Sequence, residues 1–233
     1  MDFVDRIFFF RPLDGIALGL WFAAWVATGW LIEHPPKGYP SVSILMTRYR
    51  REWMRELVTR QPRIFDASIM STLRQGTTFF ASASMIMIGS GLALIGNTER
   101  LLGLAEDLTL SDMPAVVWEM KILVILLFVA NAFLKFVWSH RLFGYCAVIM
   151  AAVPNEIDAP LALPRAEQAA EINITAARSF NRGMRALYFA LCGLAWLLGA
   201  MPLMLATAAT LFVLLRREFA SKSRQVLMRG TRM

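Results

Sequence analysis

Four long stretches dominated by apolar residues limit the folds open to this chain more than any other feature of its sequence. They cover about 15–33, 76–96, 121–140 and 186–215. Each is close to or longer than the ~20 residues that an α-helix needs to cross the hydrocarbon core of a membrane. Apolar residues make up 57% of the chain, above the ~45–50% of soluble domains. The sequence therefore predicts an all-α, polytopic integral membrane protein with four transmembrane helices in a single membrane domain, residues 1–233.

The segments between these stretches predict helices outside the membrane core. Residues 41–60 combine basic and apolar side chains at helical spacing and include Trp53, a pattern typical of an amphipathic helix on the membrane surface. Residues 164–185 predict a second interfacial helix, with glutamates near its start and arginines near its end, as the helix dipole favours. The third apolar stretch continues as a helix to about residue 153, because Pro154 cannot extend it.

The last apolar stretch, 186–215, admits two interpretations. Its 30 residues carry no charge, and Pro202 predicts a kink, which together favour one long kinked helix. The alternative is a hairpin that turns at Gly199–Pro202. Each arm would then have only about 15 residues, fewer than the ~20 that span a membrane, so we prefer the single helix.

The distribution of charge predicts which parts of the chain face the cytoplasm. Because Lys and Arg concentrate in cytoplasmic loops, the basic segments 37–76 and 140–185 are expected inside and the acidic connector 97–120 outside. The N-terminus is then periplasmic. Four crossings would also leave the C-terminus outside, yet the tail, 216–233, is basic. The charge rule and the number of crossings therefore conflict at the tail.

The net charge of +7 favours contact with anionic lipid headgroups. In a soluble protein such a charge would suggest nucleic acid. Here the basic residues flank apolar stretches, so the lipid bilayer is the expected partner and nucleic acid is not. With only two cysteines, Cys146 and Cys192, no disulfide framework is expected.

A polar face on the third apolar stretch is the candidate intramembrane site. Asn131, Lys135 and Ser139 recur at intervals of four residues, which places them on one side of a helix. Because a membrane penalises polar groups, this side should turn toward other helices or a cavity. Lys135 lies ~8 Å from the predicted cytoplasmic end, so it either snorkels to the headgroups or lines a path. The apolar cores contain no Asp or Glu, which argues against a proton-coupled pump.

Two histidines and a cysteine are the candidate interfacial ligands. His34 and His140 each end a predicted helix at the cytoplasmic membrane edge, and Cys146 lies nearby in sequence. They suggest a haem or a metal, but two isolated histidines without ligand spacing favour no metal and no cofactor. Motifs such as Gly-x-Ser-x-Gly, His-Glu-x-x-His and a Walker loop do not occur in the sequence. No catalytic residue is predicted, and an enzymatic function is not favoured.

Short motifs along most of the chain resemble those of a known membrane family. The matching pieces, in order, are Arg51-Glu52-Trp53-Met54, Arg63-Ile64-Phe65-Asp66, Gly76-Thr77-Thr78-Phe79-Phe80-Ala81-Ser82, Lys135-Phe136-Val137-Trp138-Ser139-His140-Arg141 with Tyr145-Cys146, and Ala177-Arg178-Ser179-Phe180-Asn181-Arg182-Gly183 with Tyr188-Phe189. They resemble the family catalogued as domain of unknown function 599. The resemblance implies a bacterial inner-membrane protein of about four helices and implies no activity. Its motifs fall where the predicted helices meet the cytoplasm, which suggests one basic, aromatic surface.

Three hypotheses about function follow from these patterns. The first is a scaffold or accessory protein, or a binding module, whose basic cytoplasmic face docks lipid headgroups, another membrane protein or a second copy of the chain. Its candidate contacts are Arg50, Arg51, Trp53, Arg55, Arg63, Arg141, Arg178 and Arg182. The second is an oligomeric channel or transporter with a path along the third helix, because four helices are few for a pore in one chain. The third is a haem- or metal-binding membrane protein.

Overall fold

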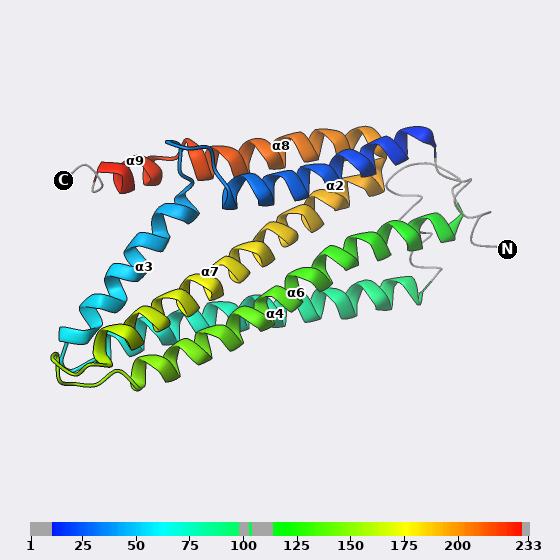
Figure 1. Ribbon diagram of the computed structural model, residues 1–233. Coiled ribbons are helices and arrows are strands. Elements are labelled where there is room, and N and C mark those ends of the chain that lie inside the picture. Colours follow the sequence, from blue (N-terminus) through cyan, green and yellow to red (C-terminus); the bar gives the residue numbers. More distant parts are fainter. Residues whose placement is uncertain (1–10, 98–102, 104–113, 230–233) are drawn as a thin grey trace. The chain divides into compact units, whose positions relative to one another are not determined.

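The structure, a computed structural model, describes residues 11–97, 103 and 114–229, and every regular element in them is a helix. The elements in chain order are α2 (Pro12–Glu33), α3 (Val42–Thr59), α4 (Ile64–Ile95), α6 (Ala115–Ala151), α7 (Ala162–Gly193), the 3-10 helix η1 (Leu194–Leu198), α8 (Ala200–Phe219) and α9 (Lys222–Arg229) (Figure 1). Four segments are long and apolar enough to cross a membrane: Pro12–Glu33, Ile64–Ile95, Ala115–Ala151 and Ala200–Arg229. The predicted all-α class with four membrane-spanning helices is confirmed. The N-terminal ten residues and most of the predicted connector 97–120 lie outside the described residues.

Two of the helices extend well beyond the apolar stretches that predicted them. α4 begins at Ile64 rather than near residue 76 and has 32 residues. At 1.5 Å per residue this is ~48 Å, longer than the ~30 Å hydrocarbon core, so part of α4 projects out of the apolar layer. α7 joins the predicted interfacial helix 164–185 to the first part of the last apolar stretch.

The described chain divides into two compact units, each with its own hydrophobic core. Unit 1 comprises the described residues up to Trp30 together with Ala83–Ala132 and Met184–Leu215. Unit 2 comprises Leu31–Ser82, Phe133–Gly183 and the described residues from Arg216 onward. Five helices, α2, α4, α6, α7 and α8, contribute residues to both units.

The core of unit 1 is built around Trp21, which is fully buried. Its ring stacks on Phe128 with 4.3 Å between ring centroids, and its indole Nε1 donates to the Phe189 carbonyl oxygen at 3.1 Å. A Cβ atom on Gly193 would lie only 2.8 Å from the Trp21 ring. Glycine at this position therefore lets α7 approach α2 closely enough for the indole to reach the α7 backbone.

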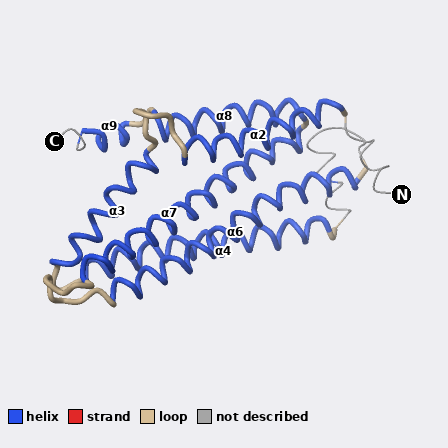
Figure 2. Tube along the Cα trace, in the orientation of Figure 1, coloured by secondary structure: helices blue, strands red, loops and turns tan. Residues whose placement is uncertain are grey.

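The last apolar stretch forms a hairpin, so the preferred single kinked helix is wrong. α7 ends at Gly193, η1 follows, and Gly199 has a φ of +123°, a region that favours glycine because other residues clash there. Cys192 Sγ on α7 lies 3.5 Å from Thr207 Oγ1 on α8, although 15 residues of straight helix would separate them by ~22 Å. The chain thus reverses direction between α7 and α8 (Figure 2). The short-arm objection fails because α7 starts at Ala162, far upstream of the apolar stretch.

Unit 2 brings the basic tail back to the segment that follows α2. α9 packs against α3. The Arg224 guanidinium carbon lies 4.0 Å from the centroid of the Tyr39 ring, and its Nε donates to the Pro40 carbonyl oxygen at 2.9 Å. Glu218 accepts from the backbone N–H of Ser43 at 3.0 Å. These contacts place the tail beside the predicted cytoplasmic segment, as the charge rule requires.

The core of unit 2 joins α3, α4, α6 and α7. α7 buries a stripe of small residues, which lets neighbouring helices approach closely. Members of the stripe are Ala162, Ala166, Ala169, Ala170 and Ala176, and the larger side chains of this core include Met54, Leu57, Met70, Phe143 and Met150.

Candidate functional site

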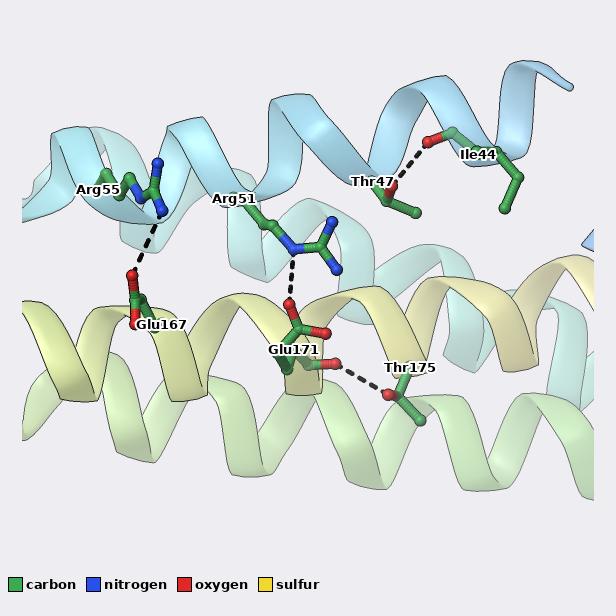
Figure 3. A network of polar contacts seen from close by, with 7 residues as sticks. All are labelled: Ile44, Thr47, Arg51, Arg55, Glu167, Glu171 and Thr175. Atoms are coloured by element: carbon green, nitrogen blue, oxygen red, sulfur yellow. Dashed lines mark hydrogen bonds and ion pairs between the residues drawn. The ribbon is translucent and has the colours of Figure 1, made fainter. Parts of the chain in front are cut away.

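Two arginines of α3 pair with glutamates of α7 inside unit 2. Arg51 Nε lies 2.6 Å from Glu171 Oε1, and Arg55 Nη2 lies 3.3 Å from Glu167 Oε1 (Figure 3). The hydrogen bond from Arg51 to Glu171 raises the pKa of the Arg51 guanidinium. Both arginines were predicted to contact headgroups, and the structure places them in contacts between two helices of the same chain.

Arg50, another arginine of α3 that was predicted to contact headgroups, also points toward α7. Its guanidinium donates to Asn173 Oδ1, and burial lowers its pKa. Asn173 is fully buried and its amide donates to Cys146 Sγ at 3.6 Å. Cys146 in turn donates to the Ala169 carbonyl oxygen at 3.3 Å. The cysteine that was a candidate ligand therefore lies in the core, within a chain of hydrogen bonds that ties α3, α6 and α7 together.

We expect Arg51→Glu to lower the free energy of unfolding by no more than about 1 kcal/mol, because both partners of the pair are roughly half exposed and water screens them. The exchange Arg51→Glu with Glu171→Arg should recover part of the loss. Thermal unfolding in detergent measures both. The control is Arg178→Glu, an exposed arginine of α7. Loss of phospholipid binding by Arg51→Glu at unchanged stability would instead favour the predicted headgroup contact.

Asp66, in the first turn of α4, is a buried carboxylate that the sequence did not single out as a site. Its Oδ1 accepts from Trp53 Nε1 at 2.7 Å and from the Arg60 guanidinium. Asp66 is fully buried, and its second oxygen, Oδ2, has no hydrogen-bond partner among the described residues. Trp53, a predicted headgroup contact, thus donates its indole N–H within the protein.

Arg63 anchors the start of α4 to the end of α6. Its Nη1 donates to the Val153 carbonyl oxygen at 2.6 Å and its Nη2 to that of Pro154 at 2.7 Å. Both acceptors follow the last turn of α6, where carbonyl groups lack helical partners. The third nitrogen of the guanidinium, Nε, is buried and has no partner among the described residues.

A pocket of about 880 Å³ lies within unit 2 beside these residues. Its lining includes three basic residues, one carboxylate and an apolar wall. The polar and charged members are Arg63, Asp66, Ser71, Arg74, Gln75, Thr78, His140 and Asn155, and the apolar members are Leu57, Ala67, Met70, Phe79, Ala147, Met150 and Ala151. The volume and the mixture of apolar walls with a few polar groups are typical of small-molecule sites.

His140, a predicted ligand, lines this pocket. Its Nδ1 lies 3.2 Å from the hydroxyl oxygens of Thr77 and Thr78 on α4. The threonines orient the ring, and each in turn donates to the Arg74 carbonyl oxygen. His34 is exposed, and no group of three or more His, Cys, Asp or Glu able to hold a metal occurs among the described residues.

The remaining predicted basic contacts differ in their surroundings. Arg182 Nε donates to Glu33 Oε1 at 2.8 Å, which ties α7 to the end of α2. Arg141 lies over the ring of Tyr145, one turn further along α6. Arg178 is exposed on α7.

The predicted polar face of the third apolar stretch is used in part for helix packing. Ser139 is fully buried and donates to the Ala176 carbonyl oxygen at 2.7 Å. Ser179 returns the contact by donating to the Lys135 carbonyl oxygen at 2.9 Å. The side chains of Asn131 and Lys135 are half-buried, and Asn131 belongs to unit 1. A path along this face stays a prediction.

A polar cluster in unit 1 was also missed. Lys121, nearly fully buried, donates to the Trp196 carbonyl oxygen at 3.0 Å, and Trp196 Nε1 donates to Asp14 Oδ1 at 2.8 Å. These bonds tie α2 and α6 to η1 at the hairpin. The sequence signal was available, because Lys121 stands at the start of the third apolar stretch and a membrane protein seldom buries a lysine without a partner.

The pocket residues of α4 also had a signal in the sequence. If α4 is drawn as one continuous helix from residue 64, Asp66, Met70, Arg74 and Thr78 share one face at spacings of four residues. The predicted span began near residue 76, so Asp66, Met70 and Arg74 were assigned to a different segment from Thr78. The pocket was therefore missed because a helix boundary was drawn where the charge-free stretch began.

Comparison with known proteins identifies a family. The family described as "Protein of unknown function, DUF599" matches residues 16–223, most of the chain. No curated protein matches the chain, and no solved structure matches it. The predicted resemblance is confirmed: this multi-pass chain, with its four helices able to span a membrane, belongs to the DUF599 family of proteins of unknown function.

Proposed function

We propose that the protein is a phospholipid-binding module of the cell inner membrane, in which the pocket of unit 2 receives a lipid headgroup. The observation that carries the proposal is the lining of the pocket. Arg63, Arg74 and His140 supply cationic or hydrogen-bonding groups for a phosphate. Met70, Phe79 and Met150 supply an apolar wall for acyl carbon atoms.

The level of the pocket along α4 supports this ligand. The uncharged part of the helix begins near residue 76, and Arg74 and Thr78 stand on either side of that point. This is the depth at which phosphate groups lie when the uncharged part fills the hydrocarbon core. Arg74 is exposed, and no ion pair of Arg74 occurs among the described residues, so its charge is available to a ligand.

The proposal places segments 37–76 and 140–185 on the cytoplasmic side. The contacts of the basic tail with Tyr39 and Pro40 support a C-terminus on the same side, because lysines and arginines then gather on one face as the positive-inside rule expects. The scaffold or accessory role follows from the same surface, with the bound lipid as the link to the bilayer.

We expect Arg74→Gln to weaken phospholipid binding about tenfold, the equivalent of one charge-assisted hydrogen bond. The measurement is a titration of the full chain in detergent with dioleoyl phosphatidylethanolamine or dioleoylglycerol, read by native mass spectrometry. Wild-type protein should bind the phospholipid in preference to the diacylglycerol, which has no phosphate. Arg178→Gln removes another exposed arginine, outside the pocket, and should leave binding unchanged.

Two results would reject the proposal. One is equal binding of the phospholipid and the diacylglycerol by the wild-type chain, since the basic groups would then play no part. The other is an equal loss of binding in Arg74→Gln and Arg178→Gln, which would point to a diffuse charge effect rather than to the pocket.

A further inference from the structure

Two buried polar atoms of the pocket lining are without a hydrogen-bond partner among the described residues. They are Asp66 Oδ2, a hydrogen-bond acceptor, and Arg63 Nε, a hydrogen-bond donor. Folded proteins rarely leave such atoms unpaired, because their desolvation is then uncompensated. Both residues line the same pocket, so one ligand entering it can supply both missing partners once a small shift of the two side chains exposes these buried atoms.

The chemistry of the two atoms specifies that ligand. An ionised carboxylate only accepts hydrogen bonds. Asp66 Oδ1 already accepts hydrogen bonds from Trp53 and Arg60. Oδ2 therefore calls for a donor, and preferably a cation. Arg63 Nε and the nearby Arg74 call for an acceptor, and preferably an anion. A ligand that carries only negative charge would be repelled by the Asp66 carboxylate.

We infer that the pocket selects headgroups in which a phosphate is joined to a primary amine, as in phosphatidylethanolamine. The ammonium group donates to Asp66 Oδ2, and the phosphate oxygens accept from Arg63 Nε and Arg74. This inference rests on the proposed function, because it names the headgroup that the lipid site prefers.

The spacing of the residues on α4 is compatible with such a headgroup. Arg63 directly precedes α4 and lies three residues before Asp66. Arg74 follows Asp66 by eight residues, a rise of ~12 Å. Long helical side chains lean toward the N-terminus of their helix, which brings the Arg74 guanidinium back toward Asp66. In the inferred binding mode the amine lies at Asp66, the phosphate lies toward Arg74, and the acyl chains follow the apolar wall toward Phe79.

The test compares two lipids that differ only at the headgroup nitrogen. Dioleoyl phosphatidylethanolamine and dioleoyl phosphatidylcholine share the phosphate, the acyl chains and the net charge, but the choline nitrogen carries no hydrogen. Native mass spectrometry of the full wild-type chain in detergent should show about tenfold tighter binding of the ethanolamine lipid. In Asp66→Asn this preference should disappear, while the phosphate-dependent binding remains.

A matched variant distinguishes an effect on lipid recognition from a general effect of disturbing the contacts of Asp66. Arg60→Gln removes the ion pair of Asp66 from a residue that does not line the pocket. It should keep the preference for the ethanolamine lipid. If Asp66→Asn does not fold, the lipid comparison on wild-type protein and on Arg60→Gln still decides the question.

Each outcome has a distinct meaning. Equal binding of the two lipids by the wild-type chain overturns the inference and leaves the proposed function standing, as does a preference that survives in Asp66→Asn. Binding of neither lipid above dioleoylglycerol overturns both. Competition by soluble phosphoethanolamine as strong as that by the lipid would support the phosphate–amine chemistry and overturn the membrane as its source.

Discussion

A cysteine introduced in place of Lys222 is expected to react with a membrane-impermeant maleimide from the same side of the membrane as one introduced in place of Lys37. The reason is the contact between the tail and the segment after α2, where Arg224 reaches Tyr39 and Pro40. Labelling of intact cells and of inverted membrane vesicles measures the sidedness. The expected difference is all or none, because a charged reagent does not cross the bilayer.

The controls for this experiment are present in the chain. The native cysteines, Cys146 and Cys192, are buried and should contribute little background. A cysteine at Asn97, beyond the apolar end of α4, should label only from the opposite side if α4 crosses the membrane. Labelling of positions 222 and 37 from opposite sides would contradict the hairpin and restore a single crossing by the last apolar stretch.

Gly183→Ala is expected to lower the free energy of unfolding by about 1–3 kcal/mol, the cost of an overpacked core. A Cβ atom on Gly183 would lie 2.7 Å from Cε1 of Phe136, a fully buried ring. That ring stacks on Phe80 with 5.4 Å between centroids and tilts against Phe180 at 5.5 Å. Because rings hold it on two sides, Phe136 cannot move away without disturbing the whole aromatic cluster.

The matched control is Gly144→Ala in α6. A Cβ atom there would meet nothing within 4 Å, and alanine is favoured over glycine inside a helix by up to ~1 kcal/mol. Thermal unfolding of the two variants in the same detergent should therefore give shifts of opposite sign. A similar loss in both would mean that helix flexibility, rather than the packing of Phe136, explains the need for glycine.

Two local features of the chain agree with the hydropathy and helical period that predicted them. The basic amphipathic segment 41–60 forms α3 (Val42–Thr59). The third apolar stretch continues as a helix to Ala151, near the expected residue 153. Both outcomes follow from patterns within one segment: the spacing of apolar residues in the first case, and an apolar run closed by a proline in the second.

The candidate site was predicted only in its outline. The sequence placed basic residues where helices leave the membrane, but it did not tell which of them face other helices. Arg51 and Glu171 are separated by 120 residues, and their pairing depends on how α3 lies against α7. Asp66 stands out only when its free oxygen and the pocket beside it are known. Neither the pairing nor the free oxygen has a local signal, because both depend on which helices touch. The spacing of residues along α4 indicates only which of them share a face.

The last apolar stretch shows what hydropathy along the sequence can determine and what only the packing of the helices decides. Hydropathy along the chain is enough to establish a helical membrane protein with basic flanks, because the transfer of apolar side chains into a bilayer is a local and additive effect. It favoured a single kinked helix over a hairpin, because two arms of about 15 residues fall short of a membrane span. Packing decided for the hairpin: Gly199 allows the turn, and Cys192 and Thr207 meet across it. The same packing turned the arginines of α3 toward α7 and left Arg63, Asp66 and Arg74 around a pocket, because contacts between distant segments exist only once the helices have assembled.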